Sequence, residues 1–151
     1  MAAEAPERPP ADAVVVAAGS SRRMGGVDKL ATPVAGRPLL HWTLAALRAA
    51  GPIDRLVLVT APDRVRELRD DRRLAGLVSH VVAGGATRRE SVAAGVRWLA
   101  DVDPAGAGRP VLVHDGARPL VSPAPPSRRA IPYEPRRDCR RQKFVSHAAR
   151  G

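Results

Sequence analysis

VVVAAGSSRRMGGVDK, residues 14–29, decides how this chain folds. The β-branched run at 14–16 predicts a buried strand, and the small residues after it let the backbone approach a ligand closely. Successive N–H groups in such a turn can surround an anion, and Arg22, Arg23 and Lys29 bring positive charge to the same loop. The stretch therefore points to a site for a phosphorylated nucleotide. The alternative is an ordinary glycine-rich connection that binds nothing.

Two common phosphate-binding loops are excluded by the spacing. Lys29 is followed by Leu30, so the Walker A pattern GxxxxGK[ST] is absent from this stretch. Gly19, Gly25 and Gly26 do not have the spacing of the dinucleotide pattern GxGxxG. Any nucleotide must therefore be held by another loop geometry.

The composition indicates one soluble domain with a basic tail. The chain has 151 residues, of which 44% are hydrophobic, and a formal net charge of +10. Strong basicity raises the possibility of a nucleic-acid-binding module. However, almost all of the cations are arginines in an Ala-, Gly- and Pro-rich chain, and only 3% of the residues are aromatic. Few rings are thus present to stack bases, so a nucleic-acid partner is not favoured.

Cysteine content and hydropathy suggest a cytoplasmic location. Cys139 is the sole cysteine, which excludes an intramolecular disulfide. No apolar run reaches the length of a membrane span, so we expect no membrane partner. Residues 1–12 are expected to be a flexible leader, because they contain no apolar signal core.

Strand and helix patterns alternate along the rest of the chain. Buried strands are predicted near 14–16, 55–60, 78–82 and 110–114, with a turn over 32–38 and helices over 39–50, 62–74 and 89–100. Strands separated by helices of this length indicate a mainly parallel sheet with crossover helices, an α/β fold. Three glycine-bearing loops, 18–29, 83–91 and 114–119, should therefore meet at the carboxyl ends of the strands, where such sheets bind ligands.

The second and third loops contain polar side chains suited to a nucleotide. Ser91 is expected in the first turn of a helix, where an acceptor or anion is favoured. Arg88 is suited to phosphate or to a surface acid. Asp115 ends a predicted strand, where one carboxylate together with substrate phosphates can hold Mg²⁺, directly or through water.

The three loops together resemble a known family. AAGSSRRMGGVDK, GGATRRESVAAGV and VLVHDGARPLV are similar, in order and separation, to the signatures of 2-C-methyl-D-erythritol 4-phosphate cytidylyltransferases. The resemblance covers residues 13–123 and implies a Rossmann-like nucleotidyltransferase fold. It also implies CTP and methylerythritol phosphate as substrates, release of pyrophosphate, a step of non-mevalonate isoprenoid synthesis, Mg²⁺ or another divalent cation, and a homodimer.

The resemblance also implies roles for single residues. Arg23 and Lys29 would be the catalytic cations, since positive charge stabilises the transition state of phosphoryl transfer. The nucleotide would contact Ala17, Ala18, Gly19, Gly85, Arg88 and Ser91, with Gly85 and Ser91 reading the cytosine. Asp115 would lie near the metal and ribose, and Arg118 near the second substrate or among the residues that support the site. A phosphate nucleophile needs no base, so His114 is interpreted as structural.

Several departures limit the resemblance. Asp28 replaces a proline before the lysine, which is expected to loosen that turn; Ala86 stands where an acid is common, and Gly116 replaces alanine. Residues 124–151 are Pro- and Arg-rich and resemble nothing in the family. They are either a disordered basic tail, such as a nucleic-acid arm, or an altered reading frame that replaces the remaining strands and dimerising arm.

The residues leave the exact reaction open. We expect family ancestry with little or no activity in this chain, with the fold incomplete at its C-terminus. A ribitol-phosphate cytidylyltransferase and a molybdenum-cofactor nucleotidyltransferase remain alternatives.

Overall fold

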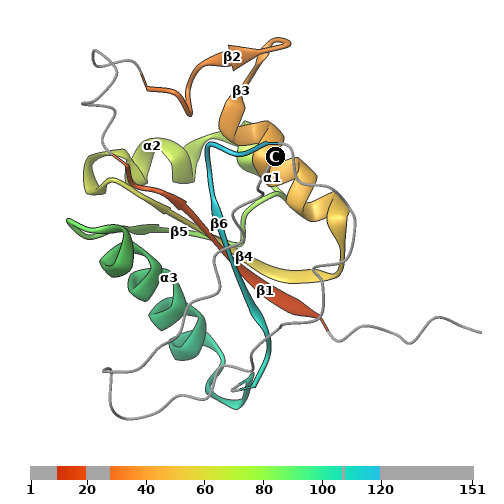
Figure 1. Cartoon of the computed structure of the whole chain (residues 1–151), viewed down its shortest axis with the longest axis vertical. Helices are drawn as coiled ribbons and strands as arrows, with labels where there is room; N and C mark the ends of the chain where they lie inside the picture. Colours follow the sequence, from red (N-terminus) through yellow and green to blue (C-terminus); the bar gives the residue numbers. More distant parts are fainter. Residues whose placement is uncertain (1–9, 20–27, 107, 120–151) are drawn as a thin grey trace, which may run out of the picture.

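The computed structural model describes residues 10–19, 28–106 and 108–119. A four-stranded parallel sheet forms the centre, with strand order β5-β4-β1-β6 (Figure 1). Its strands are β1 (Ala11–Ala17), β4 (Ile53–Thr60), β5 (His80–Ala83) and β6 (Val111–Asp115). The helices are α1 (Leu39–Ala50), α2 (Val65–Asp70) and α3 (Arg88–Val102), and a short hairpin joins β2 (Pro33–Val34) to β3 (Arg37–Pro38). The predicted parallel α/β fold is confirmed.

The sheet is buried on both faces. α1 and α2 cover one face, and α3 covers the other (Figure 1). Alternate residues of β4 serve the two layers: Leu56 and Leu58 pack on the α1 side, and Val57 and Val59 on the α3 side. All four are fully buried. Such two-sided burial explains why the strands read as continuous apolar runs rather than as alternating patterns.

Helix α3 lies unusually close to the sheet at Gly95. A Cβ atom on Gly95 would lie 2.5 Å from Cγ1 of Val14 and 2.9 Å from Cγ2 of Val59. Any side chain there would push the helix outward. Gly95 therefore sets the distance between α3 and the strands that lead into the glycine-bearing loops.

The backbone N–H groups at the starts of α3 and α1 find hydrogen-bond acceptors in different ways. Thr87 and Glu90 form a capping box at the start of α3, because each side chain accepts a hydrogen bond from the other residue's backbone N–H. At the start of α1, the N–H of Leu39 donates to the carbonyl of Thr32, and that of Leu40 donates to the carbonyl of Leu30. The loop that follows residue 27 is thus joined to the beginning of α1.

Helix 39–50 is confirmed at both ends, and Leu40, Leu44 and Leu47 form its buried apolar face. The prediction of one helix over 62–74 is wrong. The segment divides into a 3-10 turn at Pro62–Arg64, α2, and a second 3-10 turn at Arg72–Leu74. The break comes at Asp71, whose backbone is extended and whose carboxylate accepts a hydrogen bond from the N–H of Arg73.

Smaller differences concern the strand limits and the turn before α1. The strand expected at 78–82 begins at His80, because the N–H of Val78 still donates to the carbonyl of Leu74 in a turn. The stretch expected as a turn contains the β2–β3 hairpin, with Ala35 and Gly36 at positive φ.

The predicted leader overlaps with the first strand of the sheet. β1 begins at Ala11, so the last residues of the expected leader belong to the sheet. Residues 1–9, Arg22, Arg23 and the tail 124–151 lie outside the described residues. Within the described ranges, no helix is long and apolar enough to cross a membrane.

Candidate functional site at the carboxyl edge of the sheet

The strand register brings the three predicted loops to one edge. Ala17 pairs with Thr60, and Thr60 pairs with Ala83, so β1, β4 and β5 end side by side. Val16 pairs with Asp115 on the other side of β1. The carboxyl ends of all four strands therefore meet, as the alternation of strands and helices predicts.

Two of the loops touch at Gly84. Its N–H donates to the carbonyl of Thr60 at 2.7 Å. A Cβ atom on Gly84 would lie 2.7 Å from both the Cβ of Ala18 and the Oγ of Ser91. Only glycine fits between them without movement of the backbone. Ala18 and Gly84 thus form one continuous surface of small groups, with the buried Ser91 beneath them.

Ser91 shapes this surface from beneath. Its side chain is buried, and its hydroxyl accepts a hydrogen bond from the N–H of Gly85 at 3.2 Å. The same hydroxyl donates to the carbonyl of Thr87 at 3.0 Å. Its backbone N–H is also bonded to that carbonyl, so the free first-turn N–H expected at Ser91 is not observed. Ser91 therefore fixes the turn at Gly85.

A cluster of charged side chains lies on the other part of the edge. Oδ1 of Asp115 accepts hydrogen bonds from Nε and Nη2 of Arg88 at 3.2 and 2.9 Å. Oδ2 of Asp115 lies 3.5 Å from Nε of Arg118. The side chains are open to solvent, with exposed fractions of 49%, 38% and 55% for Arg88, Asp115 and Arg118. We call these three residues the Asp115 cluster.

The backbone after Asp115 is firmly held. The N–H of Gly116 donates to the carbonyl of Val16, and its carbonyl accepts a hydrogen bond from Thr43 Oγ1 at 2.8 Å. Nε2 of His114 lies 2.9 Å from the carbonyl oxygen of Arg118, which supports the structural interpretation of His114. The loop thus presents Asp115 and Arg118 from a fixed base.

Lys29 is exposed, and it lies in a turn that its neighbour Asp28 organises. The Asp28 carboxylate accepts a hydrogen bond from the N–H of Leu30 at 2.9 Å and forms an ion pair with Arg64. In place of the loosening expected from the loss of proline, this side chain ties the turn down. Of the two predicted catalytic cations, the structure describes Lys29 alone.

Asp115 is the carboxylate that the sequence predicts to hold a metal ion, directly or through water. The described residues include no group of three or more His, Cys, Asp or Glu side chains able to hold one. A closed all-protein cage is therefore absent from this part of the chain. A half-exposed carboxylate with one closely bonded oxygen suits Mg²⁺, which needs only one or two carboxylates when phosphates supply further ligands.

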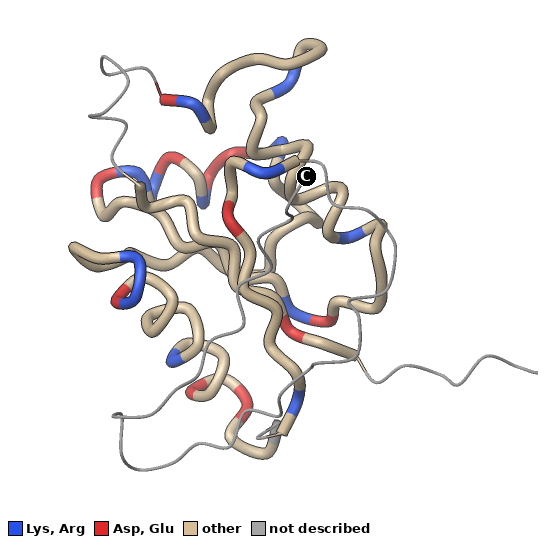
Figure 2. Tube along the Cα trace, in the orientation of Figure 1, with Lys and Arg blue, Asp and Glu red and all other residues tan. Residues whose placement is uncertain are grey.

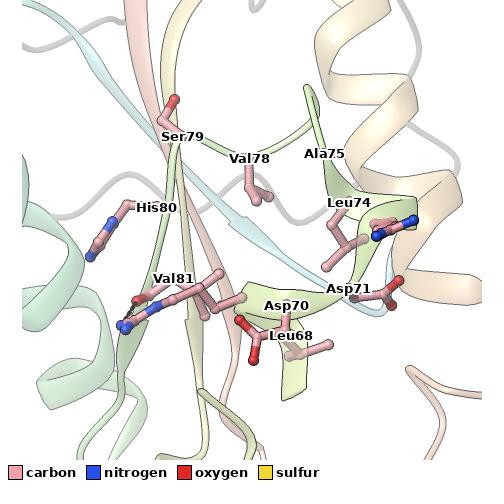
Figure 3. Close-up of a pocket in the computed structure, with 11 residues that line it drawn as sticks. Leu68, Asp70, Asp71, Leu74, Ala75, Val78, Ser79, His80 and Val81 are labelled. Carbon is pink, nitrogen blue, oxygen red and sulfur yellow. Dashed lines mark hydrogen bonds between the residues drawn. The ribbon is translucent and has the colours of Figure 1, made fainter. Parts of the chain in front are cut away.

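A separate cavity of about 260 Å³ lies between α2, the second 3-10 turn and β5 (Figure 3). It contains none of the predicted site residues. Two of its polar side chains have protein partners: Asp71 pairs with Arg73, and Ser79 Oγ accepts a hydrogen bond from the N–H of Leu56. The cavity gives no sign of the predicted chemistry.

Several residues that shape the site were not singled out from the sequence. Thr87 and Glu90 were detectable, because T-x-x-E before an apolar run is a capping-box pattern. Arg64 had no such signal, since its partner Asp28 is distant in the chain. Thr60 is fully buried at the strand ends, and its Oγ1 has no hydrogen-bond partner among the residues that the structure describes; nothing in the sequence marks it.

Solved structures define the class of protein. A 4-diphosphocytidyl-2C-methyl-D-erythritol synthase from Anaerococcus prevotii matches with a TM-score of 0.55 and 30% identity, over 76% of this chain and 46% of that chain. A Mycobacterium tuberculosis protein solved in complex with manganese matches with a TM-score of 0.54 and 30% identity, over 77% of this chain and 55% of that one. The fold is that of these α/β proteins.

The family model for 2-C-methyl-D-erythritol 4-phosphate cytidylyltransferase matches residues 11–131, and the chain belongs to that family. Curated relatives of that name are 38% identical over 114 residues in Dehalococcoides mccartyi and 45% identical over 113 residues in Cereibacter sphaeroides. Each match covers 74% of this chain, but only 47% and 48% of the respective relative. The chain thus spans about half the length of these relatives.

Proposed function

We propose that this chain binds CTP at the carboxyl edge of its sheet, as the nucleotide-binding part of a cytidylyltransferase acting on methylerythritol phosphate. The observation that carries the proposal is the contact of Ala18, Gly84 and Ser91 beside the Asp115 cluster. A surface of small groups next to paired cations and one carboxylate suits a nucleoside triphosphate with its metal.

The small groups would receive the nucleoside. A Cβ atom on Gly19 would meet nothing within 4 Å, so the backbone there is open to a ligand. At Gly85 the N–H is bonded to Ser91 and the side chain of Glu90 packs on the backbone, so this turn would act through its fixed shape. Because Ser91 fixes the Gly85 turn, backbone groups there can be held in the positions that distinguish cytosine from uracil. A site built to bond one base edge rejects a base with the opposite donors and acceptors, since buried polar groups are then left unpaired.

The cations would receive the phosphates. In the reaction implied by the family, a phosphate oxygen of methylerythritol phosphate forms a bond to the α-phosphorus of CTP, and the bond to pyrophosphate breaks. Negative charge grows on the phosphate oxygens during this step, and positioned cations stabilise it. Lys29 and Arg88 would serve here, together with Arg23.

Asp115 would hold the divalent cation, directly or through water. Its Oδ1 is engaged by Arg88, whereas its contact to Arg118 at 3.5 Å is loose. Mg²⁺ or a similar ion would supply charge neutralisation between the phosphates. Arg88 can then turn from Asp115 toward the triphosphate, since an exposed ion pair is worth at most about 1 kcal/mol.

We expect CTP binding with little or no turnover in this 151-residue chain. Arg118 is the one described residue assigned to the second substrate, and the relatives are about twice as long as the matched region. Binding of methylerythritol phosphate is therefore expected to be weak. Steady pyrophosphate release with both substrates present would contradict this expectation.

Calorimetric titration of the purified chain with CTP and with UTP, each with Mg²⁺, tests the proposal. CTP should bind at least about tenfold more tightly than UTP, a difference of about 1.4 kcal/mol. The variant Arg97→Met serves as a control and should bind both nucleotides as wild type does, because Arg97 is exposed on α3 away from the predicted site residues. Equal affinity for the two nucleotides, or no binding of CTP, would overturn the proposal.

A further inference from the structure

We infer that Arg64 is a positioning residue for Lys29, which it holds in place by clamping the side chain of Asp28. The inference rests on the proposed function, in which Lys29 contacts the phosphates of CTP. Arg64 is the last residue of the 3-10 turn that follows β4, and it is 36 positions from Asp28 in the sequence. The ion pair therefore joins two separate segments at the carboxyl edge of the sheet.

The Asp28 side chain does two things at once. One carboxylate oxygen accepts the hydrogen bond from the N–H of Leu30, and the other is bound by Nη1 of Arg64. Its backbone carbonyl accepts hydrogen bonds from the N–H groups of Ala31 and Thr32, both at 3.1 Å. Asp28 is therefore the centre of the turn that contains Lys29.

The other side of this turn is anchored differently. Leu30 packs against the α1-side core, and its carbonyl accepts a hydrogen bond from the N–H of Leu40. Lys29 thus lies between an anchored Leu30 and an Asp28 whose only ion-pair partner among the described residues is Arg64. Release of Arg64 would free the Lys29 backbone on the side that leads into the first loop.

Arg64 is itself preorganised. Its Nε and Nη2 donate to the two oxygens of Glu67 at 3.2 and 3.0 Å, one turn further on. The hydrogen bonds that the Arg64 guanidinium donates to Glu67 raise its pKa, with a further contribution from the charge of Asp28. A guanidinium that is fixed by one carboxylate can hold a second carboxylate at a defined place.

The experiment compares Arg64→Met with Arg66→Met. Both variants remove one positive charge from the same short segment, but Arg66 is exposed on α2 and forms none of these contacts. The affinities of wild type and both variants for CTP and for cytidine are measured by titration. Arg64→Met should weaken CTP binding about three- to tenfold and leave cytidine binding unchanged, because only the phosphates reach Lys29; Arg66→Met should change neither.

Coupling to Lys29 separates positioning from a general structural role. In the Lys29→Met background, Arg64→Met should have no further effect on CTP affinity. Asp28→Asn should reproduce Arg64→Met, because an amide cannot form the ion pair. Equal losses for CTP and cytidine, or full additivity with Lys29→Met, would overturn the inference.

A measurement without nucleotide keeps the inference testable if the proposed function fails. Hydrogen exchange of the Leu30 and Thr32 amides should be faster in Arg64→Met than in Arg66→Met, with the other core amides unchanged. If wild type binds no CTP, the proposed function is wrong. If wild type binds CTP but the two variants exchange alike, the inference about Arg64 is wrong and the proposed function stands.

Discussion

The amino and carboxyl edges of the central sheet, where its strands begin and end, both hold arginines and aspartates, but in opposite ways. Figure 2 shows charged residues near the starts of β1 and β4 and at the end of β6, whereas the middle parts of the strands carry none. At the amino edge, Asp12 is only 3% exposed at its side chain and is bound by Arg55 through two hydrogen bonds of 3.0 and 2.6 Å. Asp103 lies 3.4 Å from the same guanidinium, and Arg109 reaches both Asp12 and Asp54.

The Asp115 cluster at the carboxyl edge is exposed instead and is surrounded by glycine-bearing loops. A buried, two-point ion pair holds strands together, and removal of one partner leaves a charge in a nonpolar setting. An exposed cluster adds little to stability, so its charges are available to a ligand. The difference teaches that the same residue types hold strands together at one edge and lie open to solvent at the other.

Arg55→Met should produce the largest loss of stability. The substitution leaves Asp12 buried without its two-point partner, which is expected to cost about 3–5 kcal/mol. Urea denaturation of the variant and of wild type gives the difference in the free energy of unfolding. Arg97→Met is the control and should change it by less than about 0.5 kcal/mol. Similar values for both variants would mean that the amino edge is no more structural than the surface.

Gly95→Ala tests whether the close packing of α3 on the sheet is required for the stability of the fold. A helix-interior glycine normally gains up to about 1 kcal/mol on change to alanine. Here the new Cβ would meet Val14 and Val59, so we expect the free energy of unfolding, measured by urea denaturation, to fall by about 1–3 kcal/mol. Gly51→Ala is the matched control, because its backbone is extended and a Cβ there meets nothing within 4 Å. A stabilised Gly95→Ala protein would contradict the packing argument.

Asp115→Asn should change stability little but binding strongly. Because Asp115 is half-exposed, the free energy of unfolding should fall by less than about 1 kcal/mol. Mg²⁺ should then lose its effect on CTP affinity, since an amide is a poor ligand for this hard cation. Titration of CTP with and without Mg²⁺ measures that difference. An unchanged Mg²⁺ effect would remove Asp115 from the metal site.

The smallest effect is expected from the titration of His80, the first residue of β5. His80 stacks on Trp98 with ring centroids 4.6 Å apart, and burial, aided by the charge of Arg69, lowers the pKa of its imidazole. The unfolded chain therefore binds the proton more tightly, so stability should rise as the pH increases through about 6.5.

His80→Phe keeps an aromatic ring against Trp98 but removes this titration. The rise in the free energy of unfolding between pH 5.5 and pH 7.5 should be smaller in the variant than in wild type. Chemical denaturation at the two pH values measures it. A larger rise in the variant would show that the sign of the pKa change is wrong.

Much of the fold followed from local patterns. The helix Leu39–Ala50 has a regular apolar face and ends at Gly51-Pro52, so its limits could be predicted. The break at Asp71 was harder to predict, because the same charged composition is compatible with a continuing helix. Only the hydrogen bond that the Asp71 carboxylate accepts decides where the helix ends. Asp12 could not be recognised as buried, since its partner Arg55 is 43 positions away.

The site could be predicted where its residues lie in contiguous motifs. The meeting of the loops that contain Gly84 and Asp115 followed from parallel topology alone. The pairing of Asp115 with Arg88 depends on side-chain rotamers, and the sequence left surface acids in general as an alternative partner. The roles of Arg23 and of residues 124–151, and the expected homodimer, stay predictions.

The position of β1 in the sheet also governs when this chain can fold during synthesis. β1 leaves the ribosome first, yet its two neighbours are β4 and β6, and Asp12 lies opposite Val111. Closing so long a loop is slow compared with local helix formation. Until the codons for β6 have been translated, one edge of β1 stays open to strands of other chains. A nascent chain halted before Val111 should therefore aggregate, whereas one extended well past Asp115 can pair β6 with β1.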